Sequence, residues 1–199
     1  MDYFYTVESQ IEYEEKIKRS IFIATIESVS SIDSAKKFIS TVSSLHKTAS
    51  HNCWAYIVGD KAEISHSSDA GEPSGTAGKP MLNGLQKHDL SNVAVVVTRY
   101  YGGVKLGVRG LIEAYGSSVE NAVSKAKLKK IVKIQIYKLQ TSYDFLDILT
   151  YNLKKMKAKI TDSQYTENVT VTIEVEEKDQ EILNKYIVEL TNSGKIIRI

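Results

Sequence analysis

Three cations and three glycines are interleaved between residues 99 and 109, a stretch that contains no acidic side chain. They are Arg99, Lys105, Arg109, Gly102, Gly103 and Gly107. The apolar run Val93–Val97 before them predicts a buried strand, and an amphipathic helix is expected just after them. Glycines let backbone N–H groups approach an anion, and a helix start adds positive potential. The stretch therefore predicts an anion-contacting turn, although a purely structural turn with glycines at positive φ is the open alternative.

The same stretch does not predict nucleotide hydrolysis. Gly102 and Gly107 have the spacing of a phosphate-binding loop, but Val108 and Arg109 follow them. Such a loop requires Lys and then Ser or Thr at those two positions. We therefore assign no catalytic residue to the glycine-rich turn.

A second polar loop is predicted at Asp69–Pro80, because this segment holds both prolines of the chain and three of its glycines. Its candidate functional residues are Asp69, Gly71, Glu72, Ser74, Gly75 and Thr76. Loops held by a rigid scaffold often carry function, and a solvated connection would have a similar composition. The carboxylates of Asp69, Glu72 and Glu113 could serve acid–base work or bind Mg²⁺, but solvated roles are the stronger expectation.

His51 and Cys53 lie two residues apart on a predicted strand, so their side chains share one face. This spacing could make a Cys–His nucleophilic pair or half of a metal site. The other histidines, His46, His66 and His88, show no ligand spacing. A lone cysteine on an apolar strand is usually part of the core. We therefore expect a core cysteine, no metal and no cofactor.

The composition is that of an ordinary globular protein of 199 residues, with one cysteine and a net charge of +2. That charge is too small to predict nucleic-acid binding by bulk electrostatics, so any anionic partner needs a local cluster. No run approaches the roughly 18 apolar residues of a membrane span, and Met1–Tyr5 does not begin a secretory signal. With its single cysteine, the chain is expected to be cytoplasmic and to have no membrane partner.

The C-terminal third predicts a β-α-β-β-α-β domain of the ferredoxin-like kind. Asp179 is expected to cap the second helix, and Gly194 fits the position just past its end. The expected elements are strands at 132–140, 159–165, 169–175 and 195–199, with helices at 143–157 and from 179 to the region of Gly194.

The N-terminal part is predicted to be a separate mixed domain, which gives an α+β protein with domains at 1–131 and 132–199. Its first two strands, at 4–7 and 11–18, are expected to form a hairpin. The other expected strands are at 20–27, 53–58, 62–67 and 93–97, and the expected helices start near Asp33, at Met81 and just after Gly107.

Three segments together resemble the IMPACT family, including its bacterial YigZ-type members. They are His51–Tyr56, Asp69–Gly78 and Thr98–Gly107, the last extended by Arg109 and Gly110. The resemblance covers roughly residues 16–125, and the ferredoxin-like tail extends it to nearly the whole chain. It implies an N-terminal domain of the ribosomal-protein/elongation-factor type, an α/β sandwich with a four-stranded sheet and two helices on one face.

The resemblance also implies a function in the regulation of translation. Eukaryotic relatives restrain a stress-response pathway by competing for a ribosome-associated activator of a kinase, through extra regions that this chain lacks. We therefore expect a regulator that associates with the ribosome, RNA or a translation factor. In this hypothesis Arg99, Lys105 and Arg109 neutralise phosphates, and the rings of Tyr100, Tyr101 and Trp54 stack on bases.

Two alternatives belong to other classes of protein. One is a hydrolase that uses the Asp69–Thr76 loop together with Arg99. The other is a protein-interaction module that presents the same surface without binding nucleic acid. The full set of expected binding residues is Arg99, Tyr100, Tyr101, Gly102, Gly103, Lys105, Gly107, Arg109, Asp69, Gly71, Glu72, Ser74, Gly75, Thr76, His51 and Trp54.

Overall fold

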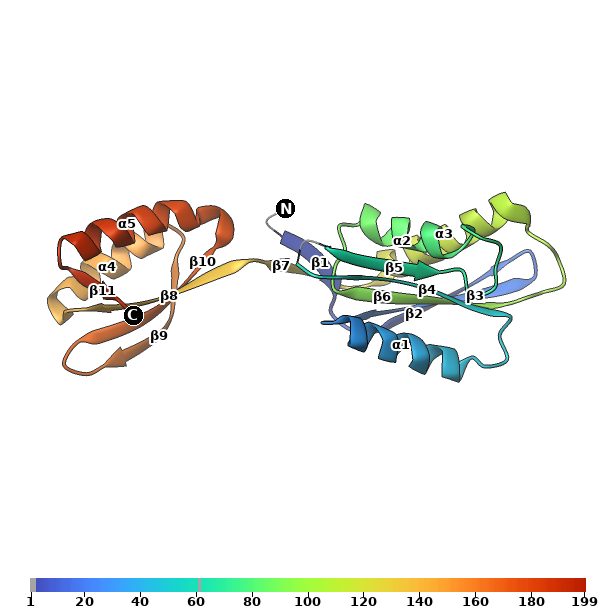
Figure 1. Ribbon diagram of the computed structural model, residues 1–199, viewed down its shortest axis with the longest axis horizontal. Helices are drawn as coiled ribbons and strands as arrows, with labels where there is room; N and C mark the ends of the chain where they lie inside the picture. Colours follow the sequence, from blue (N-terminus) through green and yellow to red (C-terminus); the bar gives the residue numbers. More distant parts are fainter. Residues whose placement is uncertain (1–2, 61) are drawn as a thin grey trace. The chain divides into compact units, whose positions relative to one another are not determined.

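The computed structural model describes residues 3–60 and 62–199. The chain divides into two compact units, one that reaches Ile131 and one that runs from Val132 to Ile199. Figure 1 draws both units, and each has its own sheets and helices. The fold class is α+β, as predicted.

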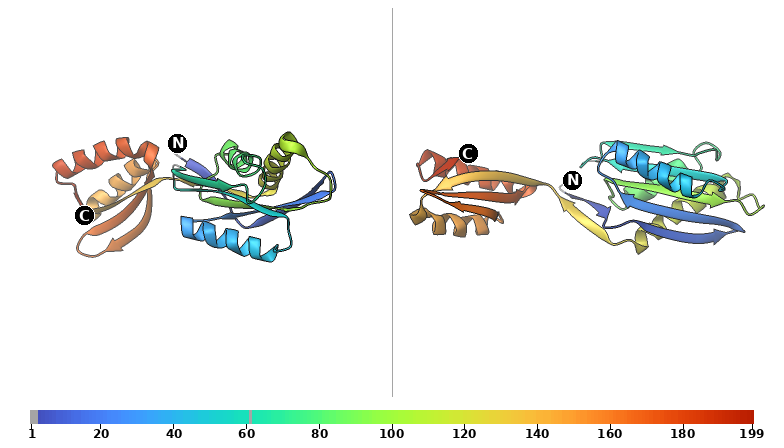
Figure 2. Two further views of the ribbon diagram at one scale, coloured as in Figure 1. Left: turned by 45° about the vertical axis from the view of Figure 1, so that its right-hand side comes forward. Right: turned by 90° about the horizontal axis from the view of Figure 1, so that it is seen from below.

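The N-terminal unit is built on a five-stranded antiparallel sheet. In sheet order the strands are β2 (Ile11–Ile17), β3 (Ser20–Ser28), β6 (Val93–Tyr100), β4 (His51–Val58) and β5 (Ile64–Ser68). Helices α2 (Gly78–Lys87) and α3 (Gly107–Lys125) cover one face, and α1 (Ile32–Leu45) covers the other (Figures 1 and 2).

Two helices lie on one face, as the resemblance implied, but the sheet has five strands and not four. The other face is covered by α1, whose Phe38 and Val42 are buried together with Ala94 and Val96 of β6. The alternate residues of β6, such as Val95, pack toward α2 and α3 instead. Because both faces of β6 are covered, the strand reads as a continuous apolar run and not as an alternating one.

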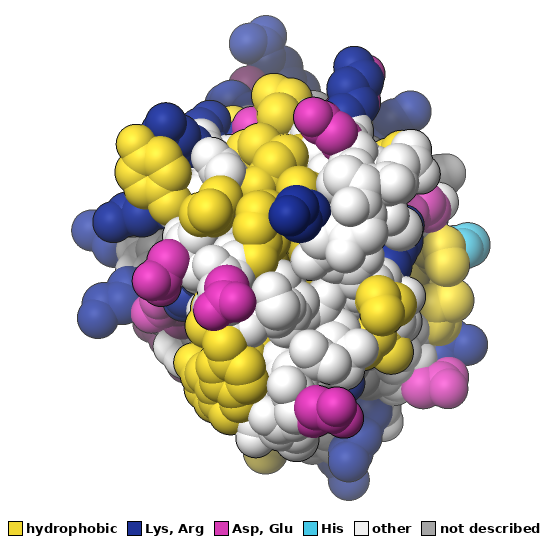
Figure 3. All heavy atoms as spheres, turned by 90° about the vertical axis from the view of Figure 1, so that its left-hand side faces the viewer, with side chains coloured by type: hydrophobic (Ala, Val, Ile, Leu, Met, Phe, Trp, Pro, Cys, Tyr) yellow, Lys and Arg dark blue, Asp and Glu magenta, His cyan; other side chains and the backbone are white. Residues whose placement is uncertain are grey.

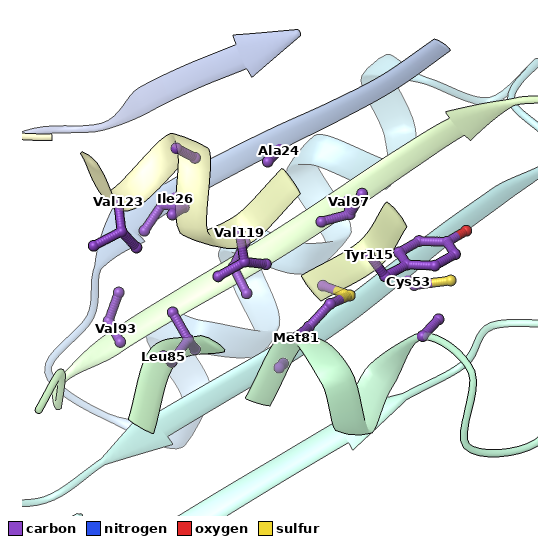
Figure 4. Packing of buried hydrophobic residues seen from close by; sticks show 14 of the residues in the cluster. Ala24, Ile26, Cys53, Met81, Leu85, Val93, Val97, Tyr115, Val119 and Val123 are labelled. Atoms are coloured by element: carbon purple, nitrogen blue, oxygen red, sulfur yellow. The ribbon is translucent and has the colours of Figure 1, made fainter. Parts of the chain in front are cut away.

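The larger core lies between the sheet and the α2–α3 layer. Figure 4 shows side chains of this core from three sources: Met81 and Leu85 of α2, Val119 and Val123 of α3, and the strands β3, β4 and β6. Tyr115 belongs to this core, and its ring meets the ring of Phe22 edge to face with the centroids 5.3 Å apart. This packing fixes the middle of α3 against β3.

The first strand does not form the hairpin predicted for it. Strand β1 (Tyr3–Val7) pairs with β7 (Leu128–Val132) in a separate two-stranded sheet, and β2 pairs with β3. The β2–β3 turn is closed by Lys18 and Arg19, both at positive φ (43° and 72°). Such a two-residue turn matches the twist of a hairpin. The partner of β1 lies more than 100 residues away, so local pattern could not identify it.

The C-terminal unit has the predicted ferredoxin-like topology. Its sheet order is β11-β8-β10-β9. Along the chain, α4 connects β8 to β9, and α5 connects β10 to β11. The elements are β8 (Ile134–Thr141), α4 (Tyr143–Lys155), β9 (Lys159–Tyr165), β10 (Val169–Glu176), α5 (Gln180–Asn192) and β11 (Ile196–Arg198). The alternating valines and Ile173 of β10 are buried, as their period of two predicts.

The two ends of α5 compare differently with the prediction. Gly194, at φ +69°, follows the helix, and the Lys195 amide donates to the Leu190 carbonyl at 3.0 Å, which is a Schellman motif. Asp179 does not cap the other end with its side chain, because a 3-10 turn (Glu177–Asp179) precedes the helix and gives Asp179 a helical backbone. Its carboxylate lies 3.6 Å from Lys157 Nζ instead.

Hydrophobic side chains gather in patches on the face of the C-terminal unit that Figure 3 shows, and charges of both signs lie between them. This face is therefore not a continuous basic surface of the kind that binds nucleic acid through charge alone. Among the helices of the described chain, none has the length and apolar character needed to cross a membrane.

Candidate functional site

The N-terminal unit has a pocket of about 530 Å³ at the place where β4 begins, β6 ends and α3 begins. Its position follows from the sheet register, since His51 lies directly opposite Arg99. Its lining residues are Ser50, His51, Glu72, Pro73, Arg99, Tyr101, Lys105, Leu106, Gly107, Val108 and Leu111. We call it the Glu72–Arg99 pocket. All three segments that carry the family resemblance contribute to it.

A buried ion pair forms one wall of this pocket. Arg99 Nη1 donates to Glu72 Oε1 at 2.6 Å, and the two side chains are only 6% and 4% exposed. Tyr115 Oη donates to the same oxygen at 2.8 Å. The guanidinium carbon lies over the rings of Phe22 and Tyr101, 5.4 Å and 5.3 Å from their centroids. Each charge therefore depends on the other, because an unpaired charge is costly in this environment.

The ion pair changes the role expected for Arg99. The sequence predicted a cation free to neutralise a phosphate, because no acid lies near it along the chain. The fold brings in Glu72 from a loop 27 residues away, and the pair is neutral overall. Arg99 therefore lines the pocket as half of an ion pair, and its charge is not exposed to neutralise a phosphate.

His51 lies beside the ion pair. Its Nδ1 is 3.0 Å from the Ala70 carbonyl oxygen, which can only accept, so Nδ1 carries the hydrogen. Its Nε2 is 3.9 Å from Glu72 Oε2. The ring is thus oriented by the loop backbone, with its second nitrogen facing the carboxylate.

Cys53 shares the His51 face of β4 and is buried in the core, both as predicted, and its Sγ donates to the Asp69 carbonyl at 2.9 Å. Burial raises the pKa of the thiol to about 12. A protonated, enclosed thiol is neither a nucleophile nor a metal ligand. In the described ranges, 3–60 and 62–199, no group of three or more His, Cys, Asp or Glu residues is placed to hold a metal ion.

Asp69 organises the second loop and does not line the pocket. Its Oδ1 accepts from the amides of Ala77 and Gly78, both at 2.9 Å, and its Oδ2 accepts from Gly75 at 2.8 Å. Burial alone would raise the pKa of this carboxyl, but the three backbone amides lower it below its ordinary value. Asp69 thus supplies the cap that Ala77, at the start of α2, cannot supply.

The remaining residues of this loop are also structural. Gly71 and Gly75 have positive φ (90° and 76°), and Thr76 is buried with its hydroxyl donating to the Pro73 carbonyl at 2.6 Å. Ser74 is exposed and does not line the pocket. The loop presents only Glu72 and Pro73 to the pocket.

The glycines of the glycine-rich turn are required for two different physical reasons. Gly103 and Gly107 have positive φ (82° and 75°), which favours glycine. Gly102 does not, but a Cβ at this position would collide with the backbone carbonyl of Arg19. The turn therefore brings Lys105 and the first residues of α3 to the pocket.

Three residues expected at the same site lie elsewhere. Tyr100 is on the opposite face of β6 from Tyr101, with its hydroxyl 2.9 Å from His46 Nδ1. Trp54 is on the α1 face, stacked on Tyr56 with the centroids 5.8 Å apart. Successive residues of a strand point to opposite faces, so neighbours in sequence such as Tyr100 and Tyr101 cannot stack on one ligand.

Arg109 is the third. Its side chain is 93% exposed and bonds Glu113 Oε1 at 3.0 Å, one helical turn later. It does not line the pocket. Of the three cations in this stretch, Lys105 lines the pocket without an acidic partner in the same stretch. Arg99 and Arg109 are each paired with a glutamate from outside the stretch.

Sequence reasoning expected the start of the helix after Gly107 at the site but missed two residues further along it. The hydroxyl of Tyr115 was not connected with Glu72. Leu111 lies one turn before it and lines the pocket. A signal was present, because a buried tyrosine on an apolar helix stripe requires a hydrogen-bond partner for its hydroxyl.

The fold and the site define a two-domain α+β protein whose N-terminal unit carries a pocket and whose C-terminal unit is ferredoxin-like. Residues 18–123 match the family model described as the Impact N-terminal domain, and residues 139–193 match the one described as a domain of unknown function, DUF1949. The chain belongs to the IMPACT family.

Individual relatives agree with this assignment. The chain is 37% identical over 195 residues to the IMPACT family member YvyE of Bacillus subtilis, covering 98% of this chain and 90% of that protein. It is 37% identical over 153 residues to the IMPACT family member YigZ of Escherichia coli, covering 76% and 75%. A crystal structure described as that of an hypothetical protein has a TM-score of 0.66 at 29% identity and covers 100% of this chain and 97% of its own.

Proposed function

We propose that this protein regulates translation by associating with a component of the translation machinery through the Glu72–Arg99 pocket. The observation that carries the proposal is the convergence of the three family segments on one pocket. Sites that recognise a ligand are concave, mostly apolar and contain a few polar groups, as this pocket does. The family resemblance supplies the connection with translation.

The side chains of the pocket favour binding over catalysis. Ser50 Oγ accepts from the Tyr101 amide at 3.1 Å, and His51 is oriented by Ala70, so the two are not arranged as nucleophile and base. Cys53 is protonated and lies behind the pocket. Glu72 is engaged with Arg99 and Tyr115. The hydrolase alternative therefore has no nucleophile–base pair among the described lining residues.

One observation favours the protein-interaction alternative. Val108 and Tyr101 line the pocket and are 62% and 46% exposed, so the rim offers apolar surface as well as charge. Apolar surface of this kind is common at protein interfaces. A protein partner without nucleic acid is therefore the second candidate.

Sedimentation of ribosomes from a translating extract tests the proposal. We expect the wild-type protein to sediment with ribosomes or a translation factor and to change the rate of reporter synthesis. Lys105→Glu should weaken both effects by about tenfold, because it reverses the charge of a pocket cation. Arg109→Glu is the matched control, since Arg109 belongs to the same stretch but lies outside the pocket.

Equal effects of the two variants would contradict a role for the pocket. Loss of association at high salt would favour an RNA contact, because phosphate neutralisation releases counterions. Association that is insensitive to salt would favour the protein-interaction candidate.

A further inference from the structure

We infer that the Glu72–Arg99 pocket binds one phosphorylated nucleotide, either free or at the end of an RNA strand. This inference rests on the proposed function, because it names the chemical group by which a translation component is held. Four features of the pocket carry it: an open helix start beside a lysine, an unpartnered buried N–H, an accepting carboxylate oxygen and an exposed aromatic ring.

The phosphate binds at the start of α3. Lys105 is exposed and lines the pocket together with Gly107, where the helix begins. The residue at the cap position is Leu106, whose side chain cannot accept a hydrogen bond, so the N–H groups of the first turn are left for a ligand. A helix of 19 residues contributes a full positive end to such a site.

Arg99 provides the second, independent observation. The residue is 5% exposed and lines the pocket, yet its Nε has no hydrogen-bond partner among the residues that the structure describes. Its Nη2 makes only a long bond, 3.4 Å, to Ser20 Oγ. Buried donors in proteins are nearly always satisfied, and Arg99 belongs to the pocket lining, so an acceptor on a bound ligand can satisfy this N–H.

Glu72 and Tyr101 recognise the rest of the nucleotide. Glu72 Oε1 accepts from Arg99 and Tyr115, but Oε2 lies 3.9 Å from His51 Nε2, beyond hydrogen-bond distance. Oε2 can therefore accept an N–H of a base or an O–H of a ribose. The Tyr101 ring has Arg99 near it and is 46% exposed, which leaves surface on which a base can stack.

The size of the pocket selects one nucleotide. Its volume of about 530 Å³ lies within the range of small-ligand sites. Inorganic phosphate would leave Tyr101 and Glu72 without a role. An acidic peptide has no flat base to stack on Tyr101. A phosphate, a sugar and a base use all four features at once.

Calorimetric titration of the full chain tests this inference. The probes are the four ribonucleoside monophosphates, the matching nucleosides, inorganic phosphate, a short acidic peptide, and a five-residue RNA with and without a 5′-phosphate. We expect nucleotides to bind roughly tenfold more tightly than nucleosides, because the phosphate adds charge-assisted hydrogen bonds. Comparison of the free nucleotides with the phosphorylated RNA shows whether the pocket takes a free nucleotide or the 5′ end of an RNA strand. Equal binding of nucleotides and nucleosides, no nucleotide binding at millimolar concentration, or preference for the peptide would overturn the inference.

Matched variants locate the bound groups. Lys105→Ala should weaken nucleotide binding by about tenfold and leave nucleoside binding unchanged, and Lys105→Arg should restore it. Tyr101→Ala should weaken nucleotide and nucleoside binding alike by roughly tenfold, whereas Tyr101→Phe keeps the stacking ring. Arg109→Ala is the control and should bind as the wild type does. Equal losses in Arg109→Ala and Lys105→Ala would place the phosphate elsewhere and overturn the inference.

The two proposals fail in different ways. If no nucleotide binds but ribosome association still depends on Lys105, the inference fails and the proposed function stands. If nucleotides bind as expected but the protein neither sediments with ribosomes or translation factors nor changes translation, the proposed function fails, and the pocket is a nucleotide site for another purpose.

Discussion

At the scale of single residues, the site depends on a charge pair that is stable only as a pair. Glu72 and Arg99 are both almost fully enclosed, and Tyr115 donates a second hydrogen bond to the same carboxylate. The pair links the Glu72 loop, the end of β6 and α3, which are the elements that meet at the pocket. Such pairs hold a geometry more than they add net stability.

The first prediction concerns this pair. Glu72→Leu should lower the free energy of unfolding by about 3–5 kcal/mol, because it leaves the Arg99 charge buried without a partner. Adding Arg99→Met to the same chain should recover much of that loss. Urea denaturation followed by circular dichroism measures Glu72→Leu, Arg99→Met and the double variant. Single-variant losses under about 1 kcal/mol that simply add in the double variant would show that the charges are not coupled.

The second prediction concerns the pH dependence of stability from Cys53. Burial raises its pKa from the ordinary 9.0 to about 12, so above pH 9 the unfolded thiol ionises while the folded one keeps its proton. The contribution of this group to stability is therefore present below about pH 9 and is lost as the pH rises toward 12. Denaturation from pH 8 to 10.5 should show this decline, and Cys53→Ala should reduce its slope.

Burial also raises the pKa of Tyr115, so part of the alkaline decline remains in the Cys53→Ala variant. An independent measurement is alkylation of the thiol. Iodoacetamide at pH 8 should leave the folded protein unmodified and label Cys53 only after unfolding. Rapid labelling of the native protein would contradict the enclosed, protonated state.

At the scale of elements, much of the fold followed from periodicity. The alternation in β10 and the helix stripe of α3 were sufficient to identify both elements. The partner of β1 was not predictable, because it lies at the other end of the unit. Pairing depends on which segments the fold brings together, and local pattern carries no information about that.

The candidate site was predictable only in part, for reasons that are also physical. The segments that meet at the pocket were all identified, but which side chains face it was not. Tyr100 and Trp54 were placed with Tyr101 because the strand alternation was not applied to them. The prediction of three unpaired cations did not hold for Arg99 and Arg109, because acids were counted only within the stretch itself. Glu72 comes from another loop to pair with Arg99, and Glu113 pairs with Arg109 one turn along α3.

The third prediction uses two adjacent glycines as a matched pair. Gly103→Ala should cost roughly 1–2 kcal/mol, because its backbone has φ +82° and open space around the added methyl group. Gly102→Ala should cost more, since the new Cβ meets the Arg19 carbonyl and must displace the β2–β3 turn or the end of β6. Thermal unfolding ranks the two variants. The reverse order would mean that the glycine-rich turn adapts more easily than the hairpin contact suggests.

At the scale of the whole molecule, the two units differ in how they are stabilised. The N-terminal unit has buried clusters on both faces of its main sheet, whereas the C-terminal unit has one cluster between its sheet and its two helices. The formal charges of the C-terminal unit balance, since residues 133–199 contain 10 basic and 10 acidic side chains. The C-terminal unit therefore offers no excess charge with which to bind a polyanion, and we expect nucleotide binding to belong to the N-terminal unit.

The last prediction is that residues 132–199 fold without the rest of the chain. The buried cluster of this unit, which includes Leu139, Leu153 and Ile173, is formed entirely within it, and the Lys133 carbonyl accepts from the Glu177 amide at 2.9 Å to close its first strand. A fragment of this size is marginal but sufficient for a core. Urea denaturation of the fragment should give one cooperative transition by circular dichroism and by tyrosine fluorescence. Ile173→Asp is the control and should abolish the transition, since it buries an unpaired carboxylate. A disordered spectrum for the wild-type fragment, or a gradual change unaffected by Ile173→Asp, would mean that the unit needs the N-terminal part to fold.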